Sequence, residues 1–198
     1  AEGRWVTARH VVEGCRRPAL AVGGGRAVQA DVRLAPEADV AVLITQGGPG
    51  AVQIDPAPEP RPGQRAFHPG FPQGRAGEVT TRLLGSDIFR GRVRGHADEP
   101  VLAWAEVGRT RGLEGALSGL SGAPVMDAEG RVLGVTIAAS PRRGRLYTTS
   151  PERFAAAVRG VQRADEPIMP TPLTVENYGL TADALRRELR IAQVVCLG

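Results

Sequence analysis

The chain has 198 residues, of which 42% are hydrophobic and 23% are charged, with 26 glycines and 16 prolines. This composition excludes disordered and fibrous proteins, and no apolar run approaches the roughly 20 residues needed to span a bilayer. All 25 basic residues are arginine, but the net charge is only +4 and aromatic residues make up 4%, so we expect no nucleic-acid partner.

Short runs typical of β-strands, separated by turns rich in glycine and proline, follow one another along most of the chain. This pattern predicts an all-β sandwich or barrel. The expected strands lie at residues 5–8, 19–22, 27–34, 40–45, 65–68, 79–84, 101–107, 132–138 and 145–149. A stretch rich in proline and glycine at 47–62 is typical of a connector between two halves.

The last quarter of the chain favours helices. Ser150, Pro151 and Glu152 provide an N-cap, a proline at the first helical position and an acid in the first turn, with an apolar face up to about residue 163. A proline-rich connector at 164–175 precedes a second predicted helix at 182–190, capped by Thr181, and a possible strand at 191–197. We expect packing or partner contact from this tail and no more specific role.

A glycine-flanked turn at 119–125 presents Ser121 and leads into a strand. A serine hydroxyl is a poor nucleophile unless a neighbouring base takes its proton and backbone donors hold the oxyanion that forms. Candidate partners precede it. His10 ends the motif V-T-A-R-H and is followed by V-V, and Asp39 begins the motif D-V-A-V-L. Each residue alone is more often an ordinary polar side chain, but the three motifs together, in this order, favour a catalytic site.

With a further G-F-P-Q-G motif at 70–74, the chain resembles the trypsin/chymotrypsin-type serine proteases, and in particular the bacterial HtrA-like branch, over roughly residues 4 to 160. The resemblance implies an all-β fold of two six-stranded antiparallel barrels with the catalytic site in the cleft between them. We expect a first barrel at 1–62, a second at 63–150, a packing helix at 151–163 and a C-terminal extension at 164–198. The family's opening strand has no counterpart before residue 5, so we expect a fragment of a longer chain, and the extension is too short for a PDZ domain.

The resemblance also implies residue roles. His10 would be the general base, Asp39 would orient its imidazole, and Ser121 would be the nucleophile, with the backbone N–H groups of Gly119 and Ser121 as the oxyanion hole. The expected function is hydrolysis of peptide bonds through an acyl-enzyme, with a peptide or protein substrate and without a cofactor or metal. The alternatives are a catalytically silent module that binds peptides in the same cleft, and an esterase.

The specificity pocket that the resemblance implies is built around the serine loop. Its expected lining residues are Gly115, Thr136, Ile137, Ala138, Ala139 and Arg145. Gly115 stands where enzymes that cleave after Arg or Lys carry aspartate, so basic specificity is not expected. Two alternatives remain: a small apolar pocket, or Arg145 at the pocket base, where it would pair with an acidic substrate side chain. Leu120 stands where zymogen-activated relatives carry an aspartate, so we expect activity without a newly cut N-terminus.

The chain has two cysteines, Cys15 and Cys196, which are too few for a metal site. We favour a disulfide between them over two buried thiols, because an extracytoplasmic address suits this protease class. A periplasmic or secreted bacterial location is therefore expected. The sequence leaves the oligomeric state open.

Overall fold

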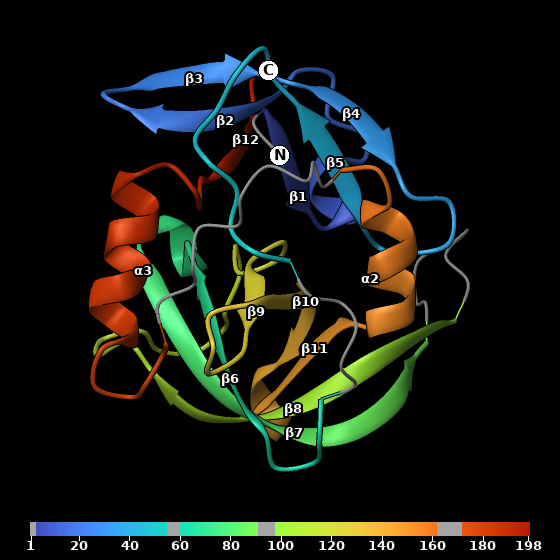
Figure 1. The fold of residues 1–198 in the computed structure, drawn as a ribbon, viewed down its shortest axis with the longest axis vertical. Helices are drawn as coiled ribbons and strands as arrows, with labels where there is room; N and C mark the ends of the chain where they lie inside the picture. The colour runs from blue at the N-terminus through green and yellow to red at the C-terminus, as the bar shows by residue number, and fades with distance from the viewer. Residues whose placement is uncertain (1–2, 55–59, 91–97, 162–171) are drawn as a thin grey trace.

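A computed structural model describes residues 3–54, 60–90, 98–161 and 172–198 of the chain (Figure 1). Strands of two halves lie one above the other in this view, with helices along the sides. Within the described residues, no helix is both long enough and apolar enough to cross a membrane.

The second half is a closed antiparallel barrel, as predicted. Its strands, in the order β10-β11-β8-β7-β6-β9, are β6 (Arg65–Gly70), β7 (Gly77–Phe89), β8 (Glu99–Arg109), β9 (Pro124–Met126), β10 (Val132–Ser140) and β11 (Arg145–Thr149). Trp104 is fully buried in the core, and its Nε1–H donates to Thr148 Oγ1 at 2.8 Å. The short 3-10 turns η1 (Pro72–Gly74) and η2 (Pro141–Arg143) follow β6 and β10. The G-F-P-Q-G motif therefore joins the first two strands of this barrel.

The first half is not the closed six-stranded barrel that we predicted. It consists of two three-stranded sheets, with the orders β1-β5-β4 and β12-β2-β3. These strands are β1 (Arg4–Thr7), β2 (Pro18–Gly23), β3 (Arg26–Gln29), β4 (Asp31–Leu34), β5 (Ala41–Ile44) and β12 (Val194–Cys196). The predicted strand at 27–34 divides at the buried Ala30, whose N–H donates to Pro18 O at 2.9 Å. Each sheet thus contains one part of that strand, and β1 and β12 remain as edges.

The helices begin with α1 (Arg9–Val12) and α2 (Pro151–Val158). The predicted cap of α2 is confirmed, because Ser150 Oγ accepts from the Arg153 N–H. Helix α2 ends at Val158 instead of near residue 163, and residues 162 and 163 lie outside the described part of the chain. The last helix, α3 (Tyr178–Arg187), begins four residues before the predicted start, and the positive φ of 55° at Leu189 follows its end.

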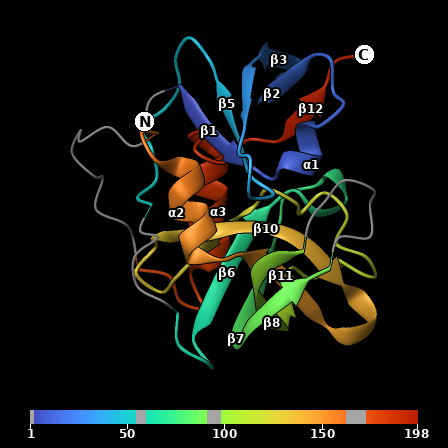
Figure 2. The same cartoon turned by 90° about the vertical axis from the view of Figure 1, so that its right-hand side faces the viewer.

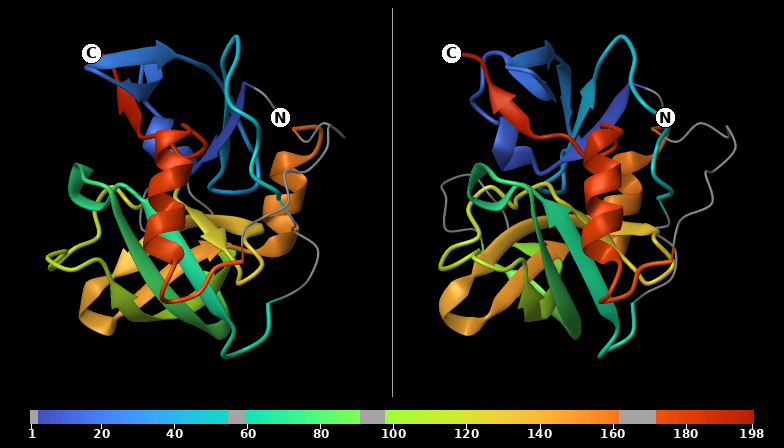
Figure 3. Two further views of the ribbon diagram at one scale, coloured as in Figure 1. Left: turned by 60° about the vertical axis from the view of Figure 1, so that its left-hand side comes forward. Right: turned by 90° about the vertical axis from the view of Figure 1, so that its left-hand side faces the viewer.

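The C-terminal tail contacts both halves of the molecule (Figures 2 and 3). On the second barrel, Arg186 of α3 lies 2.6 Å from Glu78 of β7, and its guanidinium lies over the ring of Phe71. On the first half, β12 pairs antiparallel with β2, and Cys196 forms a disulfide with Cys15, with their Cα atoms 5.8 Å apart. The tail therefore fixes the two halves relative to each other.

Candidate functional site

His10 and Asp39 are held together by two hydrogen bonds. The backbone N–H of His10, in α1, donates to Asp39 Oδ1 at 2.9 Å, and the imidazole Nδ1 lies 2.6 Å from Asp39 Oδ2. An ionised carboxylate can only accept, so Nδ1 carries the proton and Nε2 is left as the acceptor. This arrangement gives the imidazole the tautomer that a general base needs.

The same contact changes the basicity of the imidazole. The side-chain hydrogen bond to Asp39 raises the pKa of His10 above 6.5, against the opposing effect of burial, and the charges of Asp39 and Glu13 add to the increase. The His10 side chain is 40% exposed. Solvent can therefore reach the ring, and its protonation state follows the pH of the medium.

Glu99 supports the Asp39 loop from the other half of the molecule, and sequence reasoning did not find it. Its two carboxylate oxygens each lie 3.1 Å from the Asp39 backbone nitrogen and accept from its N–H. The side chain of Arg153 in α2 forms an ion pair with Glu37 of the same loop. Glu99 begins β8, 60 residues after Asp39, so no local motif indicates this contact.

The loop that carries Ser121 is fixed by two glycines in the left-handed region. Gly119 has φ 90° and Gly122 has φ 82°. A Cβ at Gly119 would lie 2.7 Å from Phe71 O, and one at Gly122 would lie 2.1 Å from Thr7 Oγ1. Both positions therefore require glycine, for conformation and for space.

Neighbouring contacts hold the loop against the second barrel. The Gly122 N–H donates to Thr136 O of β10 at 2.8 Å, and Gln73 Nε2 donates to Ala116 O at 2.9 Å. Leu120 is 1% exposed and packs in the core of this barrel. Leu120 thus anchors the serine loop in this core, and the expectation of activity without a newly cut N-terminus stays a prediction.

Two backbone donors of the loop are available to a bound group. Among the described residues, the N–H groups of Gly119 and Ser121 have no hydrogen-bond acceptor, and the Ser121 hydroxyl makes no hydrogen bond. The N–H group of a serine and that of the residue two positions before it can together form an oxyanion hole. His10 Nε2 and Ser121 Oγ are not hydrogen-bonded to each other in this state.

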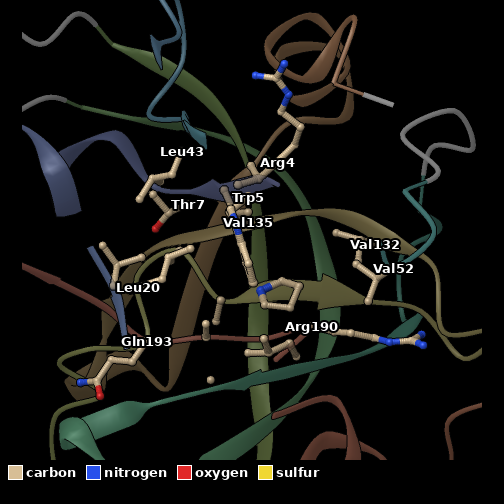
Figure 4. A pocket seen from close by; sticks show the side chains of 18 of the residues that line it. Arg4, Trp5, Thr7, Leu20, Leu43, Val52, Val132, Val135, Arg190 and Gln193 are labelled. Carbon is tan, nitrogen blue, oxygen red and sulfur yellow. The ribbon is translucent and has the colours of Figure 1, made fainter. Parts of the chain in front are cut away.

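Ser121 and His10 line one cavity of about 390 Å³ between the two halves (Figure 4). Figure 4 shows Leu20 and Leu43 on one side of it, with Val52 and Val132 on the other. Gly119 and Gly122 also line it. The structure therefore brings the predicted serine loop and the predicted histidine to a common space, with the aspartate behind the histidine.

The residues predicted to form the specificity pocket do not line this cavity. Ile137 is buried in the core, and Gly115 O accepts from Arg109 Nη1 at 3.0 Å. Arg145 pairs with Ser140, four residues along β10 from Thr136, which is about 13 Å at the usual rise of a strand. The choice between an apolar and an acidic preference stays a prediction.

His68 differs from His10 in every respect that matters for catalysis. It is fully buried, and its two ring nitrogens lie 2.9 Å from Thr136 Oγ1 and 2.8 Å from Thr81 Oγ1. Burial lowers its pKa to about 3. His68 is therefore a neutral structural residue, while His96 lies outside the described part of the chain.

Solved proteases of the same fold resemble this structure. The active form of the Rv3671c protease from M. tuberculosis is 20% identical, with a TM-score of 0.66 over 87% of this chain and 72% of that one. The MamO protease domain from Magnetospirillum magneticum is 19% identical, with a TM-score of 0.59 over 81% and 83%. The HtrA-type protease AlgW with decapeptide is 20% identical, with a TM-score of 0.61 over 81% and 50%. At these identities the likeness concerns the fold.

In sequence, no curated protein matches the chain. The family model of the trypsin-like peptidase domain matches residues 1–135, which is more than half of the chain. This match covers the His10 and Asp39 motifs and the loop of Ser121 whose geometry is described above. The chain therefore belongs to the trypsin-like peptidase domain family.

Proposed function

We propose that the protein is a serine endopeptidase in which His10, Asp39 and Ser121 form the catalytic triad. The observation that supports this most directly is the pair of hydrogen bonds from the backbone and the imidazole of His10 to Asp39, beside a cavity that Ser121 also lines. This pairing fixes both the tautomer and the orientation of the ring.

In the proposed mechanism, a substrate carbonyl enters between Ser121 and the free N–H groups of the serine loop. His10 Nε2 takes the proton of Ser121 Oγ as this oxygen attacks the carbonyl carbon. The backbone N–H groups of Gly119 and Ser121 stabilise the resulting oxyanion. His10 then donates its proton to the leaving amine, and water hydrolyses the acyl-enzyme by the same steps. Since Ser121 and His10 are not hydrogen-bonded to each other here, substrate binding has to bring them together.

The proposed substrate is a peptide or protein outside the cytoplasm. The disulfide between Cys15 and Cys196 favours an oxidising compartment, such as the periplasm or the extracellular space. The HtrA-type protease AlgW, part of which resembles this chain in fold, has been solved with a decapeptide, which supports a peptide as the ligand. Protein processing or quality control is the role that fits both observations.

Labelling with a fluorophosphonate probe tests the proposal, because the probe reacts only with an activated serine. We expect wild type and Ser118→Ala to be labelled and Ser121→Ala to be unlabelled. Ser118 is the matched control because it lies three residues away on the same loop. A folded wild-type protein that is not labelled contradicts the proposal and favours the peptide-binding module, and cleavage of ester substrates but of no peptide favours the esterase.

A further inference from the structure

The G-F-P-Q-G turn between β6 and β7 packs directly against the serine loop. A Cβ at Gly70 would lie 3.0 Å from both Ala123 Cβ and Leu120 Cδ1. One at Gly119 would lie 2.7 Å from Phe71 O. The backbone of the turn therefore touches the loop at two places, and a change in the turn would move the loop.

Gln73, the fourth residue of this turn, has a backbone conformation that residues with a side chain rarely adopt. Its φ is 56° and its ψ is 28°, in the left-handed region. Glycine adopts this conformation freely, whereas a Cβ makes it unfavourable. Because the backbone alone would favour glycine at this position, the contacts of the Gln73 side chain have to offset the strain.

The side-chain amide of Gln73 contacts the segment that leads to the serine loop. Its Nε2 donates to Glu114 O at 2.5 Å and to Ala116 O at 2.9 Å. Its Oε1 accepts from Arg75 Nη2 at 3.4 Å, and the same nitrogen lies 3.4 Å from Gly112 O. A guanidinium can only donate, so this contact determines which end of the amide faces Arg75 and leaves Nε2 for the two carbonyls.

The backbone of Gln73 bonds to the peptide that carries the first oxyanion donor. Its N–H donates to Ser118 O at 2.5 Å. The peptide between Ser118 and Gly119 is trans and planar, so its C=O and N–H point to opposite sides. The Gly119 N–H is therefore directed away from Gln73. This N–H has no acceptor among the described residues, and Gly119 lines the same cavity as Ser121.

Rotation of this one peptide would close the oxyanion hole. If it turned over, the C=O of Ser118 would take the place of the Gly119 N–H and would repel an oxyanion instead of binding it. A glycine on one side of a peptide makes such a rotation easier, because no Cβ restricts it. The bond from the Gln73 N–H to Ser118 O opposes the rotation, since it would be lost.

We propose that Gln73 is a positioning residue for the oxyanion hole, an inference that rests on the proposed peptidase function. Its backbone N–H keeps the Gly119 N–H directed to the cavity. Its side chain holds Glu114 and Ala116, so that the segment before the serine loop cannot follow a rotation of the peptide. Gln73 does not line the cavity, so it acts through the loop and not on the substrate itself.

Two variants of Gln73 test the proposal in peptide cleavage. Gln73→Glu keeps an acceptor for Arg75 but replaces the donor Nε2 by an oxygen that faces two carbonyls, and should lower kcat by about 100-fold. Gln73→Gly removes the side chain and relieves the backbone strain, and should lower kcat by about tenfold. In both, KM should stay nearly unchanged, because the oxyanion donors act in the transition state.

The pH profile separates this role from an effect on the base. His10 and Asp39 keep their contact in both variants, so the midpoint of the acid limb of kcat/KM should equal that of wild type. A general loss of structure would lower activity without preserving both KM and this midpoint.

Gln64→Ala is the matched control. Gln64 Oε1 accepts from the Arg61 N–H at 2.9 Å in the turn before β6, so this variant also loses a hydrogen bond between a glutamine side chain and the backbone. Over the described ranges, Gln64 makes no hydrogen bond to the serine loop, and it does not line the cavity. We expect its kcat to equal that of wild type. Circular dichroism establishes that all three variants fold.

The direction of the Gly119 N–H gives a second measurement, which needs no activity. Residual dipolar couplings of ¹⁵N-labelled protein report the orientation of single N–H bonds. Wild type and Gln64→Ala should give the same coupling at Gly119, whereas Gln73→Glu should change it. The amide at position 73 should also exchange with solvent about tenfold faster or more in Gln73→Glu, because its bond to Ser118 O is weakened.

Three results would overturn the proposal. The first is a kcat equal to that of active wild type in both Gln73 variants. The second is a loss of kcat with a raised KM or a shifted midpoint, which would place Gln73 in substrate binding or in control of the base. The third is an unchanged dipolar coupling at Gly119 in Gln73→Glu. A wild type that the fluorophosphonate probe does not label contradicts the proposed function instead, and the couplings then decide by themselves whether Gln73 orients the peptide.

Discussion

His10 receives its properties from one carboxylate that contacts both its backbone and its ring. The hydrogen bond to Asp39 raises the pKa of the imidazole above 6.5, and the ring is partly exposed to solvent. The protonated form is stabilised by folding. This contribution is therefore fully present below the unfolded pKa of 6.5 and is lost as pH rises through the higher folded pKa.

We expect this pKa to appear in the kinetics. Because a general base must be neutral, kcat/KM should rise with pH, with the midpoint of its acid limb above 6.5. Asp39→Asn should move the midpoint down and lower kcat by about 10⁴-fold, since the amide no longer selects the reactive tautomer. The measurement is a pH profile of peptide cleavage for both proteins. An identical midpoint in the variant would show that Asp39 does not control the base.

At the scale of elements, the end of β1 and the serine loop lie in direct contact. Thr7 is the last residue of β1, and its Oγ1 lies 2.1 Å from the position that a Cβ would take at Gly122. His10 follows three residues after Thr7, and Ser121 precedes Gly122. This contact therefore sets the distance between the two proposed catalytic residues, which come from different halves of the molecule.

The contact predicts that Gly122→Ala is strongly destabilising. The new methyl group would overlap Thr7 Oγ1 and would sit at φ 82°, with an expected cost of about 2–5 kcal/mol in the free energy of unfolding. Gly115→Ala is the matched control, because φ is 65° there but nothing lies within 4 Å of the Cβ position, so only about 1–2 kcal/mol is expected. Urea unfolding measures both. Equal losses would mean that the contact with Thr7 is unimportant.

A second variant separates overlap from backbone strain. Thr7→Ala combined with Gly122→Ala removes the oxygen that the new methyl group meets. The combination should recover part of the stability lost in Gly122→Ala, although Ala8 N at 3.1 Å would still be close.

At the scale of the whole molecule, the tail joins the two halves through chemically different contacts. Helix α3 contacts the second barrel through the ion pair of Arg186 with Glu78, which is buried to about nine-tenths on both sides. Strand β12 and the disulfide hold the first half, where Cys15 lies five residues after His10. Strand β12 and Cys196 thus stabilise the part of the first half that contains His10.

Removing the disulfide should therefore weaken the fold. It joins residues 181 positions apart, and its loss in the pair Cys15→Ser and Cys196→Ser should lower the free energy of unfolding by about 2–5 kcal/mol. The midpoint of unfolding in urea gives this value, and reduced wild type should unfold at the same midpoint as the double variant. An unchanged midpoint in both would show that pairing with β2 alone holds the tail.

The closed barrel and the disulfide were expected from the resemblance to the trypsin-like proteases, whereas the sequence by itself determined the β-rich pattern, the start of α2 and the motifs of the candidate site. These features rest on local signals: strand-length apolar runs, a Ser-Pro-Glu helix start, and short motifs around His10, Asp39 and Ser121. The family match supports the same interpretation, and the individual roles in catalysis stay predictions.

Only the tertiary structure decided how the first half is built and what supports the site. The pairing of β12 with β2 and the hydrogen bond from Asp39 to Glu99 join segments that are distant in the sequence. The predicted strand at 27–34 divides at Ala30, whose N–H bonds to Pro18. These contacts depend on which segments lie side by side after the chain has folded, and no local sequence pattern indicates that. For the same reason, the cavity beside Ser121 could be found only once the strands were in place.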